Sequence, residues 1–296
     1  MVTLTPALSP NREREVAIDL KSLNLEGITA FDQWLKSFFI NPALNYVFAT
    51  GWVDWFRKVS GNRILNDLKT GPGSWKSMLA HYDAVPKNWV DHLVNRYISF
   101  PSGLRNRQKL VISALSQLIE SYGKNGPLYL VGIGSGSGNN TLQSIKIKKS
   151  QIVSVKAQLF DLNEEAMSYG RVKARELGMD REVNFIHADA LEVEKLVSNP
   201  PQVIEMIGLI EYLSDDVLIR LMQSIQRFRA ASSSILISSI SDVHGIDRFL
   251  KRILRFDLNY RSAEKITQLL SEFGYKRFNV FPEPTGLFSV VVGYTN

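Results

Sequence analysis

The stretch from Leu130 to Thr141 reads LVGIGSGSGNNT and is the part of the chain that decides its fold. An apolar run leads into it, and glycine then recurs at positions 132, 134, 136 and 138. Glycine adopts positive φ angles at little steric cost and lets a ligand approach the backbone closely. A glycine-rich turn between a strand and a helix predicts a ligand site at the carboxyl ends of the strands in an open α/β sheet.

The sequence on both sides of this turn alternates between short apolar runs and amphipathic segments. This rhythm predicts parallel strands joined by crossover helices. The last two apolar runs are joined only by PEPTG, which predicts an antiparallel hairpin at the end of the sheet. We expect strands at 127–133, 157–161, 183–187, 202–208, 234–240, 276–281 and 287–294, and helices at 139–148, 164–177, 214–229 and 261–272.

The first third of the chain has a different character, because it holds all five tryptophans and few strand-like runs. Apolar residues spaced by three and four, such as Phe31, Trp34, Leu35 and Phe38, predict amphipathic helices. A longer helix is expected at 105–122. We predict an all-helical N-terminal cap over 1–104, with about the first 25 residues loose, and an α/β domain over 105–296.

Composition narrows the classes of function. The 296 residues are 45% hydrophobic and 22% charged, as in an ordinary globular protein. The chain has no cysteine and only four histidines, without metal-binding spacing, so we expect no disulfide, no thiol nucleophile and no metal site. The net charge of +6 is scattered, which predicts no nucleic-acid partner. With no signal peptide or membrane span in view, we expect a cytoplasmic protein; the oligomeric state stays open.

The acid at Asp161 follows the glycine-rich turn at the end of the next predicted strand. An acid there can accept hydrogen bonds from both hydroxyls of a ribose, which predicts a nucleoside-containing cofactor. A dinucleotide loop prefers the pattern G-x-G-x-x-G, but here 134, 136 and 138 give G-x-G-x-G and Asn139 follows. This pattern and the terminal hairpin resemble the class I S-adenosylmethionine (SAM)-dependent methyltransferases, which have a Rossmann-like sheet of seven strands.

The resemblance covers about residues 105–296. FDLNEEAMSYGR, GLIEYLSDD and GLFSVVVG are similar to a group of bacterial proteins assigned as methyltransferases. It implies that Asp161 binds the ribose and that Asp189 contacts the adenine amino group, although Asp189 could instead cap a helix. The residues that it implies for SAM binding are Gly132, Gly134, Ser135, Gly136, Gly138, Asn139, Asp161, Leu162, Asp189, Ala190 and Gly208.

The same resemblance places the acceptor beside the fourth and fifth strands. We expect catalytic roles for Glu211, Tyr212 and Tyr97, although Glu211 could be a solvated loop acid. Arg105 and Arg107 match an Arg-x-Arg of that bacterial group and could clamp a carboxylate or form surface ion pairs. His244 is a further candidate for substrate binding, or a plain loop residue.

Gly132 departs from the resemblance, because most such enzymes carry an acid there that helps hold the ammonium group of SAM. One hypothesis gives that role to Asn139 or to backbone carbonyls. The other is an altered pose of the aminocarboxypropyl arm, as in azetidine-2-carboxylate synthases, which cyclise SAM and release methylthioadenosine. We predict a SAM-dependent methyltransferase that acts on a small molecule under an aromatic helical lid; the alternatives are such a cyclase or an inactive SAM-binding module.

Overall fold

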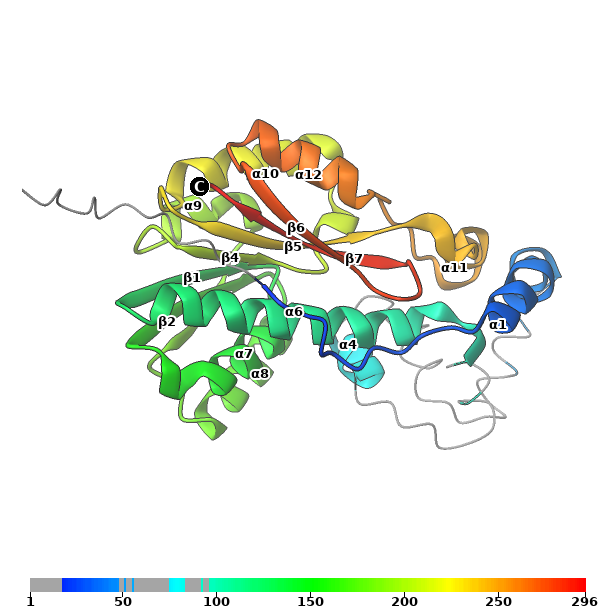
Figure 1. Ribbon diagram of the computed structural model, residues 1–296, viewed down its shortest axis with the longest axis horizontal. Coiled ribbons are helices and arrows are strands. Elements are labelled where there is room, and N and C mark those ends of the chain that lie inside the picture. Colours follow the sequence, from blue (N-terminus) through cyan, green and yellow to red (C-terminus); the bar gives the residue numbers. More distant parts are fainter. Residues whose placement is uncertain (1–17, 48–50, 52–54, 56–74, 83–91, 93–95) are drawn as a thin grey trace, which may run out of the picture.

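The protein is built around a seven-stranded sheet, which lies between layers of helices in the computed structural model (Figure 1). The structure describes residues 18–47, 51, 55, 75–82, 92 and 96–296. The strand order is β3-β2-β1-β4-β5-β7-β6, and β7 runs antiparallel to both of its neighbours. The strands are β1 (Pro127–Ile133), β2 (Ser154–Asp161), β3 (Val183–His187), β4 (Val203–Met206), β5 (Ser234–Ile240), β6 (Arg277–Pro282) and β7 (Phe288–Tyr294). The predicted α/β sheet with a terminal antiparallel hairpin is confirmed.

The inner strands are covered on both faces, which explains their continuous apolar runs. All seven residues of β5 are buried, and it spans the predicted 234–240. By contrast, β2 begins at Ser154, earlier than the predicted 157. Its first residues alternate between exposed and buried, because Ser154 and Lys156 face outward near the sheet edge. The prediction followed only the apolar half of this strand.

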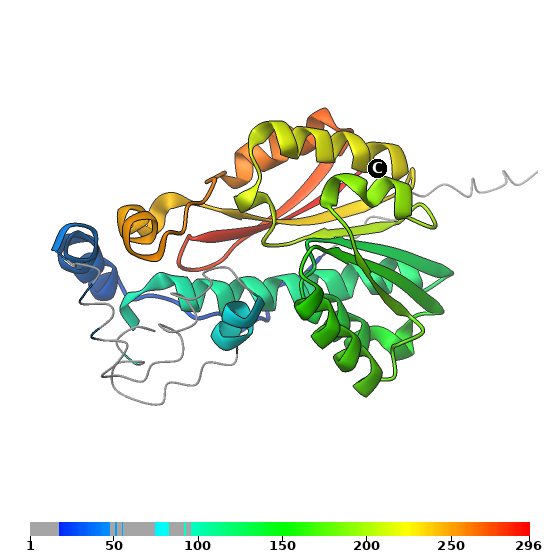
Figure 2. The ribbon, with the colours of Figure 1, turned by 180° about the vertical axis from the view of Figure 1, so that it is seen from behind.

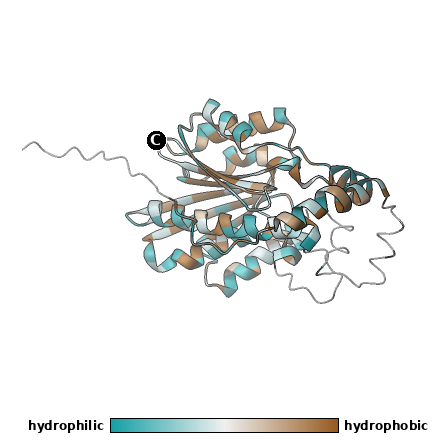
Figure 3. Cartoon of the chain, turned by 45° about the vertical axis from the view of Figure 1, so that its right-hand side comes forward, coloured by the Kyte–Doolittle hydropathy of each residue, from teal (hydrophilic) through white to brown (hydrophobic). Residues whose placement is uncertain are grey.

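Helices cover both faces of the sheet (Figure 2). One face packs against α6, α7 and α8, and the other against α9, α10 and α12. The polar faces of these helices point outward, while the strands between them are mostly apolar (Figure 3). The helices are α6 (Ser99–Gly123), α7 (Asn139–Lys148), α8 (Glu164–Glu176), α9 (Val193–Leu196), α10 (Asp215–Phe228), α11 (Asp247–Leu254) and α12 (Ala263–Glu272). Short 3-10 turns are η3 (Lys149–Gln151), η4 (Ala190–Glu192), η5 (Ile210–Tyr212) and η6 (Asp242–His244).

Helix α6 crosses the predicted boundary between residues 104 and 105 without a break. Residues 18–25, which we expected to be loose, lie along this helix instead. Leu20 is buried in the core under α6. The backbone N–H of Asp19 donates to Gln117 Oε1 at 2.9 Å, and Gln117 Nε2 donates back to the Asp19 carbonyl at 2.8 Å. These contacts between distant parts of the chain hold a segment that has no local reason to be ordered.

From Ala30 onward, the described part of the N-terminal region before α6 is mostly helical, as predicted. It contains α1 (Ala30–Leu35), the π-helical turns η1 (Lys36–Ile40) and η2 (Ala43–Val47), and α4 (Trp75–Tyr82). Turn η2 packs beside α11, through Leu44 and Leu250 among others, at the carboxyl end of the sheet. The other helices expected before residue 96 lie outside the described residues. In the part of the chain that the structure covers, no helix has the length and apolar character to cross a membrane.

Candidate active site

A cavity of about 260 Å³ opens at the carboxyl ends of the parallel strands. Gly134 after β1, Asp161 at the end of β2, Gly208 after β4 and Ile240 at the end of β5 all line it. This is the edge where open α/β sheets bind ligands, because the loops that follow the strands meet there. Its lining combines the glycine-rich turn with aromatic and aliphatic side chains.

The glycine-rich turn is held in a fixed shape by its own backbone. Gly134, Gly136 and Gly138 have φ angles of 68°, 54° and 65°, which favour glycine. The N–H groups of Gly134 and Ser135 both donate to the Phe160 carbonyl, at 2.9 and 3.1 Å. The predicted glycine roles at 134 and 136 therefore have a conformational reason, and both residues line the cavity, together with Ser135 and Asn139.

Asp161 lies directly beneath this turn. Its Oδ2 accepts the Gly136 N–H at 2.6 Å, and its Oδ1 accepts the Asn163 N–H at 2.8 Å. Each carboxylate oxygen has two lone pairs, so both keep acceptor capacity toward a ligand. The carboxylate thus orders the turn and also offers acceptors at the cavity wall.

A buried ion pair forms part of the cavity wall. Arg107 on α6 and Glu211 in η5 are 5% and 3% exposed, and Arg107 Nη1 lies 3.3 Å from Glu211 Oε1. The guanidinium also stacks on the Phe288 ring, 4.6 Å from its centroid. Within the described part of the chain, Arg107 Nε and Glu211 Oε2 have no hydrogen-bond partner. Burial raises the pKa of Glu211 above its ordinary value, against the opposing charge of Arg107.

Helix α4 covers the cavity from the N-terminal side. Its Trp75 ring packs on Tyr169 of α8 with a centroid separation of 5.1 Å. The Trp75 side chain also lies near Gly136, so α4 bridges the glycine-rich turn. The apolar lining comes from several elements: Trp75, Met78, Leu79, Tyr82, Phe100, Leu104, Leu209, Tyr212, Ile240, Phe256, Leu258 and Phe288. This aromatic wall matches the expected covering by N-terminal helices.

The structure brings only some of the expected acceptor residues into the cavity. Glu211, Tyr212 and Arg107 line it. Tyr97 does not, and its ring instead packs under the Arg96 guanidinium at 5.4 Å. The backbone of His244 lies in η6, and its side chain is outside the described residues.

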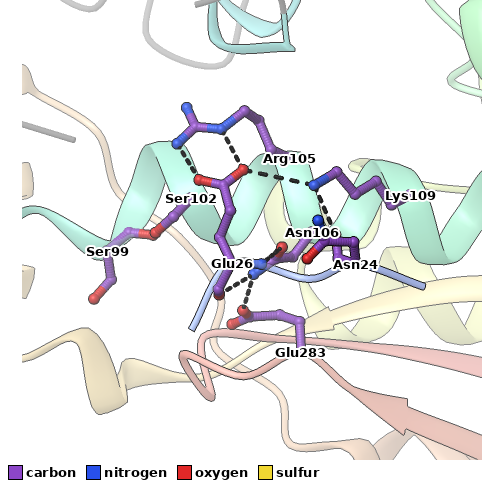
Figure 4. A network of polar contacts seen from close by, with 8 residues as sticks. All are labelled: Asn24, Glu26, Ser99, Ser102, Arg105, Asn106, Lys109 and Glu283. Carbon is purple, nitrogen blue, oxygen red and sulfur yellow. Dashed lines mark hydrogen bonds and ion pairs between the residues drawn. The ribbon is translucent and has the colours of Figure 1, made fainter. Parts of the chain in front are cut away.

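Arg105 points away from the cavity and binds the N-terminal segment (Figure 4). Its Nε and Nη2 donate to the two oxygens of Glu26, at 2.8 and 2.6 Å. The neighbouring Asn106 exchanges hydrogen bonds with the backbone of Glu26 and donates to the buried Glu283 at 3.1 Å. This network ties residues 24–26 to α6 and to the turn between β6 and β7. Arg105 therefore forms the ion pair that was the alternative to substrate binding. It differs from Arg107 because helical residues two positions apart face different sides.

Five expected cofactor residues do not line the cavity: Gly132, Gly138, Leu162, Asp189 and Ala190. Asp189 is the N-cap of η4, and its Oδ1 accepts the Leu191 N–H at 2.8 Å, so the capping alternative describes its observed contact. Leu162 is 61% exposed, and Gly138 is the N-cap of α7. Any contact of Leu162, Asp189 and Ala190 with a nucleoside stays a prediction.

Two further parts of the cavity lining were not expected from the sequence. Asn140 lines the cavity in the first turn of α7, and α4 contributes Trp75, Met78, Leu79 and Tyr82. The spacing of these α4 residues marks one helix face and was an available signal. The acid Glu205 within the apolar strand β4 was a signal of a buried polar site beside the cavity, because a carboxylate is rarely buried without partners.

The fold and this site define a class I methyltransferase architecture. Residues 84–294 match the sequence profile of a family described as "Putative methyltransferase". The chain belongs to this family, and the predicted resemblance to class I SAM-dependent methyltransferases is confirmed. None of the curated proteins matches the sequence.

Solved structures show the same fold at low sequence identity. A "possible exported protein" from Bordetella parapertussis is 14% identical with a TM-score of 0.67, over 97% of this chain and 99% of that one. Magnesium protoporphyrin IX methyltransferase from Synechocystis PCC 6803, with bound S-adenosylhomocysteine, is 13% identical with a TM-score of 0.54, over 83% and 99%. The pyocyanin biosynthetic protein PhzM is 15% identical with a TM-score of 0.50, over 89% and 72%.

Proposed function

We propose that the protein binds SAM in this cavity and transfers its methyl group to a small, largely apolar acceptor. The observation that carries the proposal is that one cavity combines two kinds of lining. The glycine-rich turn and Asp161 are suited to the cofactor, and aromatic and aliphatic side chains are suited to an apolar acceptor. The buried pair of Arg107 and Glu211 lines the same cavity.

The glycine-rich turn, Asp161 and Asn140 fit the cofactor chemically. Asp161 retains acceptor capacity for ribose hydroxyls, and the turn lets a ligand lie against backbone. Asn140 lines the cavity and leaves its buried Oδ1 without a hydrogen-bond partner among the described residues. These groups are acceptors, and a ribose and an ammonium group are donors. When bound, SAM supplies an electrophilic methyl group on a sulfonium, a good leaving group.

Glu211 is the group that we assign to proton removal from the acceptor. Its free Oε2 is buried at the cavity wall, and the burial that raises its pKa makes it a stronger base than an exposed carboxylate. Arg107 holds Glu211 Oε1 in place and leaves Nε available to a polar group of the acceptor. Glu211 would take the proton of the acceptor's nucleophilic atom as that atom gains the methyl group and S-adenosylhomocysteine leaves. Tyr212 closes the wall, with its ring 6.1 Å from that of Phe256.

The wall selects the acceptor class. Phe100, Phe256 and Phe288 pack edge-to-face at centroid distances of 6.2 and 5.9 Å from Phe100, which forms a rigid apolar surface. A cavity of about 260 Å³ suits a small acceptor. An aromatic or alicyclic molecule with a hydroxyl group fits these features.

The first experiment is incubation of purified protein with SAM, alone and with a panel of small hydroxylated aromatic compounds, followed by mass spectrometry. Release of S-adenosylhomocysteine together with a methylated compound is the expected result. Methylthioadenosine formed from SAM alone would contradict methyl transfer and favour cyclisation. Preferential binding of NAD over SAM would contradict the cofactor assignment.

The cyclisation alternative depended on an unusual pose caused by Gly132. Gly132 has a packing reason of its own: an added Cβ would overlap the Ser135 hydroxyl and lie 2.8 Å from Leu159. Among the residues that the structure describes, no contact separately favours cyclisation, so methyl transfer is the function proposed.

A further inference from the structure

A Cβ added at Gly132 would overlap the Ser135 hydroxyl and lie 2.8 Å from Leu159 Cδ2, so both side chains would have to shift to admit an acid there. Ser135 Oγ is buried without a partner among the described residues. Position 132 carries no charge in this chain, so a negative charge beside the glycine-rich turn has to come from another residue.

The neighbouring strand supplies it. Glu205 on β4 is the register partner of Gly132 on β1, and its side chain is on the face that packs on α7. It is 6% exposed and is the only charged residue in β4. Its two oxygens accept hydrogen bonds from the Thr141 hydroxyl and from Asn140 Nδ2, the latter at 3.3 Å. The acid thus sits under the first turn of α7.

These hydrogen bonds fix the orientation of the Asn140 amide. Burial raises the pKa of Glu205, against the hydrogen bonds from Thr141 and Asn140 that lower it. In its ionised form the carboxylate only accepts, so Glu205 then holds the NH₂ group of Asn140 toward itself. The amide oxygen must then point the other way, and Oδ1 is a buried acceptor without a partner in the described residues, at a side chain that lines the cavity. Asn139, the expected candidate, differs, because its Oδ1 already accepts from Gln143 at 3.0 Å.

We propose that Asn140 Oδ1 binds the ammonium group of the cofactor's aminocarboxypropyl arm and that Glu205 is the positioning residue that turns the oxygen toward it. This inference depends on the proposed SAM binding. Glu205 also provides a negative charge one side chain removed from the ammonium. The acid absent from position 132 is replaced by a carboxylate on the adjacent strand that acts through an amide.

The test uses binding of four ligands to the full chain by isothermal titration calorimetry. S-adenosylhomocysteine carries the whole arm, its deaminated analogue lacks the ammonium, its decarboxylated analogue keeps only the ammonium, and methylthioadenosine lacks both groups. We expect Asn140→Ala to weaken the binding of S-adenosylhomocysteine and of the decarboxylated analogue by roughly tenfold to 100-fold. The deaminated analogue and methylthioadenosine should bind as to the wild type.

The matched control is Gln143→Ala, which removes an exposed amide from the same helix α7 outside the cavity lining and should change all four affinities equally little. Equal losses for all ligands in Asn140→Ala would overturn the inference, because the residue would then act on the adenosine or on folding. A loss confined to the carboxylate-bearing ligands would overturn it too, since Asn140 would then present its NH₂ group.

Glu205→Gln tests the positioning role. A glutamine amide can donate to Asn140 Oδ1 and turn that oxygen away from the cavity. The same two ammonium-bearing ligands should therefore bind more weakly, and the other two should bind as to the wild type. The double variant with Asn140→Ala should show no further loss, because Glu205 acts through Asn140; additive losses would contradict this. Binding of methylthioadenosine verifies that each variant is folded. If the wild type binds none of the four ligands, the proposed function itself fails, which is a different outcome.

Discussion

Arg107 and Glu211 form an ion pair at 3.3 Å in which both side chains are almost fully buried and each keeps one unpaired polar atom. A pair that served stability alone would be expected to have its polar atoms satisfied, because each unpaired buried group costs free energy. Both residues line the cavity, which gives the unpaired Arg107 Nε and Glu211 Oε2 a use toward an acceptor.

Replacement of this carboxylate should separate chemistry from binding. We expect Glu211→Gln to lower kcat by about 10² to 10⁴, the usual contribution of a general base, with little change in SAM affinity. The base works when ionised, so wild-type activity should fall as the pH drops through the pKa of Glu211, which burial raises above the ordinary value of 4.5. A pH–rate profile checks this. If the variant keeps the same acidic limb, another group is responsible.

Asp161→Ala should weaken SAM binding by at least about tenfold. The change removes acceptors from the ribose site and releases the Gly136 and Asn163 N–H groups that the carboxylate holds. Calorimetric titration with SAM measures the effect, and Asp180→Ala, an exposed acid after α8, is the control. Unchanged affinity would remove Asp161 from the cofactor site.

Gly132→Ala should destabilise the protein, with a loss in the free energy of unfolding of about 1 to 3 kcal/mol from overpacking. The new Cβ would press on Ser135 and Leu159. A second change, Ser135→Ala, should recover part of the loss by removing the hydroxyl. Urea unfolding of the single and double variants tests the coupling. Gly126→Ala is the matched control, since no atom lies within 4 Å of its added Cβ; equal effects at both sites would disprove the packing explanation.

His81 should make stability depend on pH. It is fully buried on α4, and burial followed by the charge of Arg105 lowers its pKa from 6.5 to about 4. The unfolded chain therefore binds a proton that the folded chain does not. The contribution of neutral His81 to the free energy of unfolding is complete above pH 6.5. It is lost as the pH falls toward about 4, by up to about 3 kcal/mol.

Unfolding free energies measured between pH 7 and 4 check this prediction for His81. His81→Leu should flatten the dependence over that window, whereas His187→Gln, at an exposed position on β3, should leave the wild-type slope. An unaltered slope in His81→Leu would assign the dependence to other groups.

Arg105→Ala should loosen the N-terminal segment without emptying the cavity. The lost contacts to Glu26 are partly exposed, so we expect about 1 kcal/mol of destabilisation. Hydrogen exchange at residues 24–29 should accelerate, while the KM for an acceptor stays near the wild-type value. Arg107→Ala, two residues later, should instead raise that KM. A raised KM in Arg105→Ala would return Arg105 to the substrate site.

The sequence by itself determined the seven strands and most of the helices, although not α11. Continuous apolar runs and helical periods are local properties, so β1, β3 and β5 were located to the residue. The glycine spacing and Asp161 identified the carboxyl edge of the sheet, because a turn conformation and a strand end are also local features.

Only the tertiary structure decided what each side chain touches. Arg105 and Arg107 are two residues apart in the sequence, yet one binds Glu26 and the other Glu211, because helix α6 turns them to different neighbours. Likewise the missing acid at 132 was visible in the sequence, but its replacement by Glu205 was not. That relation exists only because β1 and β4, far apart in the chain, lie side by side in register and place the carboxylate under Asn140.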